Sequence, residues 1–283
     1  MSKNNKLYKN ILNDMKICSL CPHLCMLDKN EIGLCGARQN DGEEVKSLTY
    51  GLISAMVVDT VDKRPIMNSE INYKSLSIGS LGCSNFCRFC ENFKISQNRG
   101  LGELDYFSPE KIVNIAKDKN CQAVSMTFNE PTISYEFLID IAQECHKNDL
   151  KFILKTNGYI NSKPFKNICS VVDHMNMDWK GSESTFSQIT GCKTYITKEM
   201  ITEAYGALKE KLEISIPIYY IDEVLEEEII KVGEFLSSID TNIYCHILKI
   251  NPSYRYDDFI CTNEKMEKAR KILSKYMKNI YIS

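Results

Sequence analysis

The chain has 283 residues, of which 43% are hydrophobic and 25% charged, and its 35 basic and 37 acidic side chains give a net charge of −2. This balance is typical of a globular protein, and it argues against a broad nucleic-acid-binding surface, which is usually basic. No apolar stretch approaches the ~20 residues that span a bilayer, and the N-terminus lacks the apolar segment of a signal peptide.

The first feature in chain order is a cysteine-rich segment, Cys18-x2-Cys21-x3-Cys25-x9-Cys35. The chain holds 13 cysteines and has no export signal, so we expect a reducing, cytoplasmic location and thiols that bind metal. Four thiolates this close together can surround one zinc ion or hold an auxiliary [4Fe–4S] cluster, and ordinary buried thiols are a third reading. We therefore expect a small N-terminal metal-binding lobe, which with its linker covers residues 1–73.

From about residue 74 to residue 283, apolar strands and amphipathic helices alternate. The expected strands are 76–79, 123–128, 152–154, 171–177, 212–219, 243–250 and 280–282, and the expected helices begin at Pro109 or cover 133–147, 197–208, 223–236 and 265–276. About six such βα units require a parallel sheet with right-handed crossovers, whereas a complete TIM barrel has eight units in ~250 residues. The predicted fold class is therefore α/β, a partial (β/α)6 TIM-like barrel with a Cys-rich lobe before it.

Three more cysteines, Cys83-x3-Cys87-x2-Cys90, follow the first expected strand of the barrel. Thiolates hold iron–sulfur clusters, and a [4Fe–4S] cluster has four irons to ligate. Three ligands from one loop leave the fourth iron open to a ligand that is not protein. A structural zinc site or a ferredoxin fragment fits less well, since such zinc sites use four ligands, usually in two pairs.

This spacing, with Phe89 just before the last cysteine, resembles the signature of radical S-adenosylmethionine (SAM) enzymes. The N-terminal run Cys-x-Leu-Cys-Pro-His-x-Cys, with Gly33-x-Cys35-Gly36-x-Arg38, Tyr50-Gly51 and Asp62-Lys63-Arg64-Pro65 after it, looks like the AmmeMemoRadiSam-system members, which are similar to pyruvate formate-lyase-activating enzyme. The resemblance implies SAM on the open iron, a 5′-deoxyadenosyl radical, and a low-potential electron donor of the flavodoxin or ferredoxin type.

Polar residues stand where several expected strands end, and parallel strands carry their chemistry at that edge. The resemblance implies that Asn129-Glu130-Pro131 replaces the motif that holds the SAM amino group; the alternative is the start of a helix. Thr156 and Asn157 are candidates for the SAM ribose or carboxylate, or for a simple turn.

Further candidates lie on later strands. By resemblance Asp178 binds the ribose or the substrate and Lys180 binds the SAM carboxylate, unless the two form an ion pair with each other. Ser215 on the fifth strand and His246 on the sixth complete the predicted cofactor site, although a histidine such as His246 is more often a core residue than a catalytic one. Phe89 is expected near adenine or in the core.

Several functions are compatible with these patterns. The leading hypothesis is a radical SAM enzyme whose substrate includes, by resemblance, the glycine backbone of a partner protein. Modification of a small molecule or a nucleic acid is an alternative, and the near-neutral charge argues against the nucleic acid. A two-cluster electron-transfer protein is the non-enzymatic alternative. Among the remaining cysteines, expected to be mostly buried, Cys192 is a candidate substrate-facing thiol.

Overall fold

The barrel is a curved, eight-stranded sheet in a computed structural model that describes residues 14–63, 65–67, 74–97, 104–256 and 259–283, which leaves Arg64 outside. Its strand order is β14-β13-β12-β11-β10-β9-β7-β6. Seven neighbouring strands run parallel, namely β7 (Lys74–Gly79), β9 (Ala123–Met126), β10 (Lys151–Thr156), β11 (His174–Asp178), β12 (Leu212–Ile218), β13 (Tyr244–Lys249) and β14 (Asn279–Ile282). The predicted α/β partial barrel is confirmed.

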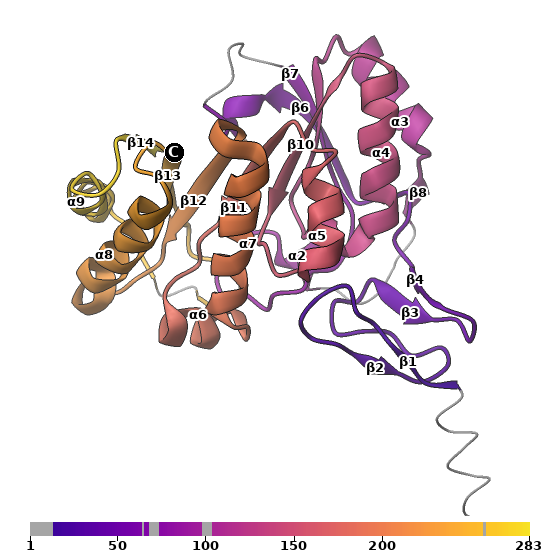
Figure 1. The fold of residues 1–283 in the computed structure, drawn as a ribbon, viewed down its shortest axis with the longest axis horizontal. Helices are drawn as coiled ribbons and strands as arrows, with labels where there is room; N and C mark the ends of the chain where they lie inside the picture. Colours follow the sequence, from indigo (N-terminus) through magenta and orange to yellow (C-terminus); the bar gives the residue numbers. More distant parts are fainter. Residues whose placement is uncertain (1–13, 64, 68–73, 98–103, 257–258) are drawn as a thin grey trace, which may run out of the picture.

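Helices cover the outer face of this sheet, as Figure 1 shows for α3, α4, α5, α7 and α8. They are α3 (Pro109–Asp118), α4 (Tyr135–Lys147), α5 (Ser162–Cys169), α6 (Glu183–Thr190), α7 (Thr194–Leu208), α8 (Asp222–Ile239) and α9 (Asn263–Leu273). Ser108 caps α3 by accepting a hydrogen bond from Lys111 N at 3.3 Å, as its position before Pro109 predicts. Covered on both faces, β12 is buried at all seven positions. None of the described helices has the length and apolarity needed to cross a membrane.

The N-terminal lobe, which we define as residues 14–50, contains only short strands. These are β1 (Lys16–Ile17), β2 (Met26–Leu27), β3 (Arg38–Asn40) and β4 (Val45–Ser47), paired as two antiparallel hairpins. Figure 1 shows them set apart from the barrel, below α4 and α5. The contacts that fix the lobe there include an ion pair, with Arg38 Nη1 2.6 Å from Glu136 Oε2 on α4, and a hydrogen bond that Asn161 Nδ2 donates to Ser19 O at 2.7 Å.

The barrel sheet begins earlier than the predicted boundary at residue 74. Strand β6 (Ala55–Thr60) pairs antiparallel with β7 along its whole length. A single strand has no core of its own, so it joins the nearest sheet edge, and a boundary at 73/74 separates two paired strands. The short elements that the sequence did not predict are β5 (Leu52–Ile53), β8 (Asp105–Tyr106), α2 (Phe93–Ser96), η1 (Val61–Lys63), η2 (Pro131–Ser134) and η3 (Lys209–Lys211), besides helices α5 and α6.

Candidate active site

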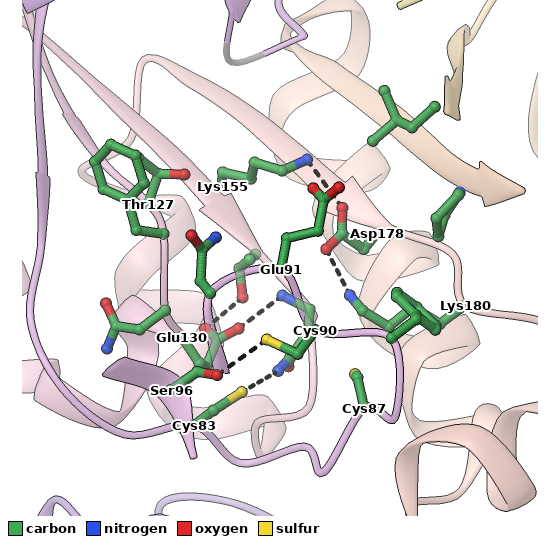
Figure 2. Close-up of a pocket in the computed structure, with 18 of the residues that line it drawn as sticks. Cys83, Cys87, Cys90, Glu91, Ser96, Thr127, Glu130, Lys155, Asp178 and Lys180 are labelled. Atoms are coloured by element: carbon green, nitrogen blue, oxygen red, sulfur yellow. Dashed lines mark hydrogen bonds and ion pairs between the residues drawn. The ribbon is translucent and has the colours of Figure 1, made fainter. Parts of the chain in front are cut away.

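A cavity of about 180 Å³ opens where the parallel strands end, with the three thiols of the cluster loop at one side (Figure 2). We define the cluster loop as residues 80–92, between β7 and α2. Seven predicted cofactor residues line the cavity beside Cys83, Cys87 and Cys90: Phe89, Asn129, Glu130, Thr156, Asn157, Asp178 and Lys180. Phe89 lies in the cluster loop and the other six come from the ends of β9, β10 and β11, so the fold assembles residues that are nearly a hundred positions apart.

The cluster loop is held in place by Asn129, which follows β9. Its Oδ1 accepts from Ser80 N and its Nδ2 donates to Gly82 O, both at 3.0 Å. Gly79 permits this approach, because a Cβ there would lie 3.0 Å from Phe128 Cβ and 3.2 Å from Thr127 O. Asn129 is therefore a positioning residue that fastens the loop to the neighbouring strand.

Among the loop thiols Cys87 is buried and Cys83 and Cys90 are partly buried, and polar groups lie close to the latter two. Asn85 N and Asn157 Nδ2 approach Cys83 Sγ at 3.4 and 3.5 Å, and Ser96 Oγ lies 3.0 Å from Cys90 Sγ. Burial raises the pKa of Cys87 to about 12, although the Lys180 ammonium acts in the opposite direction. The thiols therefore hold their protons at neutral pH until a metal displaces them.

This donor set fits a [4Fe–4S] cluster with one open iron. Three thiols come from one loop, the loop's Asn85 is buried, and its amide N and O find no partner among the described residues. Such an amide can donate to a cluster sulfur, and hydrogen bonds of this kind tune cluster potential. The nearby Lys180 ammonium complements the negative charge of a thiolate-ligated cluster.

Glu130 is held by the protein through both carboxylate oxygens. It is 1% exposed, and its carboxylate accepts hydrogen bonds from Thr132 N, Thr132 Oγ1, Thr156 Oγ1 and Asn157 N at 2.7 to 3.1 Å. Three of these described donors reach Oε1 and one, Asn157 N, reaches Oε2, so Oε2 has an acceptor position left for a further donor. The contacts tie the residues after β9 to those after β10. Burial raises the pKa of Glu130, while these donors lower it.

Opposite the thiols lies a chain of charges, in which Asp178 contacts two lysines. Lys155 Nζ lies 2.9 Å from Asp178 Oδ1, and Lys180 Nζ lies 2.5 Å from Asp178 Oδ2 (Figure 2). Burial opposes ionisation of Asp178, but the two ammonium groups lower its pKa to about 2. The predicted ion pair is present, and it is largely buried. The two ammonium groups line the cavity and are candidates to bind an anionic group, including a carboxylate.

The remaining predicted residues serve the scaffold. Phe89 lines the cavity and also stacks on Tyr219, with ring centroids 4.4 Å apart. Pro131, Ser215 and His246 are not among the residues that line this cavity, and their part in a cofactor site stays a prediction. Pro131 begins η2, Ser215 Oγ donates to Asn176 Oδ1 at 2.7 Å, and His246 Nε2 lies 2.5 Å from Glu213 Oε2. Ser215 and His246 are fully buried because they face the barrel interior beneath the cavity.

Lys155 is the cavity residue that sequence reasoning missed most clearly. It follows Phe152-Ile153-Leu154 inside a strand, and a lysine in such a buried run needs a partner. A lysine within an apolar strand was therefore the feature of the sequence that could have identified Lys155 as a site residue. The other lining residues that we did not predict are Glu91, Asn92, Ser96, Thr127, Phe128, Pro217, Leu248 and Ile250.

The four N-terminal thiols also lie near one another. Burial raises the pKa of Cys21 to about 12, and the adjacent Cys35, Cys18 and Cys25 raise it further. Within the described ranges, no three His, Cys, Asp or Glu side chains are placed to hold a single metal ion, and this applies to the cluster loop as well. Zinc or a second cluster in this lobe stays a prediction.

Comparisons with known proteins agree with this geometry. The uncharacterized protein MJ0808 of Methanocaldococcus jannaschii is 28% identical over 280 residues, which cover 96% of this chain and 82% of that protein. Among solved structures, a radical SAM methyltransferase from Sphaerobacter thermophilus matches 100% of this chain and 82% of its own, with 11% identity and a TM-score of 0.59. SuiB from Streptococcus suis, bound to precursor peptide SuiA, has the same TM-score and 14% identity, with 79% and 51% covered. At 11% and 14% identity, these two solved structures show that the fold is shared and no more.

The family model is more specific than these likenesses. The model of the radical SAM superfamily matches residues 77–236, more than half of the chain. This match includes the cluster loop and the strands that carry Glu130, Asn157 and Asp178. The protein therefore belongs to the radical SAM superfamily.

Proposed function

We propose that Cys83, Cys87 and Cys90 hold the [4Fe–4S] cluster of a radical SAM enzyme that abstracts hydrogen from a substrate. Membership of the superfamily implies this cluster and SAM as cofactors. When both are bound, an electron from the cluster breaks a C–S bond of SAM and gives a 5′-deoxyadenosyl radical. The three thiols of one loop, open to a shared cavity at the strand ends, are the observation that carries the proposal.

The chain's own residues then position the reactants. Asn129 and Asn157 hold the cluster loop, and Lys155 and Lys180 supply positive charge for a carboxylate such as that of SAM. Glu130 lines the cavity, and its Oε2 accepts from one described donor, so the carboxylate can position the loops after β9 and β10 and also accept a hydrogen bond from the SAM amino group. Burial around the thiols and the wall of Pro217, Leu248 and Ile250 restrict water at the reacting atoms.

For the substrate, we propose a peptide or protein segment, as expected for a protein similar to glycyl-radical activases. The described sheet ends in two strands, β6 and β14, that are not paired with each other, so the barrel is open at its side. An open side admits an extended chain more readily than a closed barrel does. The fold shared with SuiB, which was solved with a precursor peptide, supports this choice.

For the location, we propose a reducing cytoplasm, with which the free thiols of all 13 cysteines are compatible.

The test is anaerobic reconstitution with iron and sulfide, reduction with dithionite, addition of SAM, and chromatography for 5′-deoxyadenosine. We expect slow formation of 5′-deoxyadenosine by the wild type and none by Cys87→Ala. An electron-transfer protein would bind iron and be reduced, but would form no 5′-deoxyadenosine. That result would remove the enzymatic proposal and leave the two-cluster carrier.

A further inference from the structure

The two cysteine groups of this protein touch each other through their ligand residues. Cys35 O in the N-terminal lobe accepts a hydrogen bond from Cys83 N in the cluster loop at 3.1 Å. Gly82 makes this approach possible, because a Cβ at that position would lie 2.3 Å from Cys35 O. Cys35 and Cys83 also line one cavity of about 280 Å³. The two groups are therefore adjacent in space, although they are far apart in sequence.

His23 makes a second contact between the same two segments. Its Nε2 donates to Ser84 O at 2.7 Å, across 61 positions of sequence. The ring packs between Phe86 and Tyr159, with centroid distances of 5.9 and 5.1 Å, and Cys192 Sγ donates to the same carbonyl at 3.6 Å. A residue two positions after Cys21 thus contacts the residue next to Cys83.

The N-terminal thiols are arranged with an inner and an outer side. Cys18, Cys21 and Cys35 are buried, whereas Cys25 is partly exposed. Cys35 is the thiol residue that contacts the cluster loop, so a metal centre held by the four thiols would have solvent on one side and the cluster loop on the other.

We propose that Cys18, Cys21, Cys25 and Cys35 hold a redox-active iron–sulfur cluster, and that this lobe passes electrons to the cluster loop through the Cys35–Cys83 and His23–Ser84 contacts. The inference rests on the proposed function, since it needs a cluster at Cys83, Cys87 and Cys90. One electron leaves a low-potential flavodoxin- or ferredoxin-type donor and ends on the catalytic cluster. The donor is oxidised by one electron, the lobe cluster returns to its starting state, and no bond or proton moves.

A zinc ion in the lobe could not pass electrons to the cluster loop. Zn²⁺ has no redox chemistry, so a zinc site would only support the fold. The potential of an iron–sulfur cluster depends on hydrogen bonding and solvent exposure, which the buried and the exposed sides of the lobe would set. The contact between ligand residues is what a relay requires.

The first experiment counts metal in anaerobically reconstituted protein. We expect about eight irons per chain in the wild type, and about four in both the Cys21→Ala variant and the Cys83→Ala/Cys87→Ala/Cys90→Ala variant. The latter should also give the electron paramagnetic resonance signal of a reduced cluster. Stoichiometric zinc in place of iron in the lobe would overturn the proposal. The single Cys21→Ala count decides the question if the triple variant does not fold.

The second experiment follows reduction of the catalytic cluster, by freeze-quench resonance and by bleaching of its visible absorption, with a flavodoxin and its reductase as the donor. We expect Cys21→Ala to lose donor-driven reduction of the catalytic cluster. His23→Ala should slow this reduction about tenfold, which is the size of effect found when residues that support metal ligands are removed. His23→Gln, whose amide can donate to the same carbonyl, should restore most of the rate. The control is His146→Ala, a histidine on α4 that contacts Asp173.

Dithionite separates the two proposals, because a small reductant can reach the catalytic cluster directly. We expect the Cys21→Ala and His23→Ala variants to form 5′-deoxyadenosine with dithionite. If dithionite-reduced wild type forms none, the proposed function fails. If it does, but donor-driven reduction is unchanged in Cys21→Ala and His23→Ala, the relay alone is wrong.

Discussion

The cluster loop and the N-terminal lobe both present cysteines, but they are supported in different ways. The cluster loop follows a six-residue strand that is paired on both sides, by β6 and β9, and Asn129 and Asn157 from nearby strand ends hold it. The lobe has strands of two or three residues, and its Ile17 and Met26 are more than half exposed. The barrel therefore prepares the first site without a metal, whereas the lobe has little core to hold the second.

This difference suggests that metal has a different structural role at each site. A site built on a packed sheet loses chemistry when its ligands are removed, but keeps its fold. A small lobe with few buried apolar residues depends on metal binding and on its contacts with the barrel. The predictions below test this contrast.

The largest effect is expected for Cys87→Ala. Removing one of three cluster ligands should abolish formation of 5′-deoxyadenosine and lower the iron content, because the loop then supplies only two thiolates. The thermal midpoint should change little, since the sheet holds the loop. Cys169→Ala, a similarly buried thiol on α5, is the matched control and should keep its activity. If Cys169→Ala also lost the formation of 5′-deoxyadenosine, the loss in Cys87→Ala could be explained by removal of a buried thiol of any kind, and Cys87 would not be shown to be a cluster ligand.

Removal of metal should affect the lobe far more than the barrel. After chelation we expect new protease cleavage within residues 14–50, while the barrel resists, because the lobe's hairpins have little core. Mass spectrometry of limited digests locates the cuts. Equal protection of both regions before and after chelation would show that packing against α4 alone holds the lobe.

Asp178→Asn should destabilise the barrel by about 3 kcal/mol, because it leaves the buried Lys180 ammonium without the carboxylate that it contacts. The pKa of Asp178 is lowered to about 2, so its contribution is present above its ordinary value near 4 and is lost as the pH falls from about 4 to about 2. Urea unfolding at several pH values measures both. The variant should lack this acid-dependent loss; an identical pH profile would contradict the assignment.

Glu130→Gln should lower the free energy of unfolding by about 1 to 3 kcal/mol. The variant places an amide NH2, which is a donor, where the described donors converge on a carboxylate oxygen. We expect SAM to bind more weakly as the loops after β9 and β10 loosen. Urea unfolding and equilibrium dialysis with SAM test these effects. Undiminished stability combined with complete loss of SAM binding would instead favour direct contact with the cofactor.

The smallest effect is expected for Arg38→Ala. Arg38 is buried, but its partner Glu136 is 45% exposed, so the pair should contribute only about 1 kcal/mol. The change should loosen the lobe from α4, and digestion within residues 14–50 should become faster. Lys147→Ala, which removes an exposed ion pair on the same helix, is the control.

Much of the fold could be predicted because its signals are local. Strand β12 and helix α8 lie within one or two residues of their predicted starts, since apolar runs and periodic stripes specify them directly. Helices α5 and α6 were missed because they have eight residues each, so each offers little more than two turns of pattern. Strand β6 was missed because its exposed edge carries no clear alternation, and only pairing with β7 makes it part of the sheet.

The sequence alone identified the candidate ligands of the cluster loop, since three thiols within eight residues need no tertiary contact to be found. It also determined the parallel sheet and hence the edge where the cavity lies. Which polar residues face that cavity depends on the tertiary structure, because burial and hydrogen-bond partners come from other strands. The fold placed Lys155 in the cavity lining and Ser215 and His246 outside it, and it placed Cys35 against Cys83, a contact between segments that no local pattern connects.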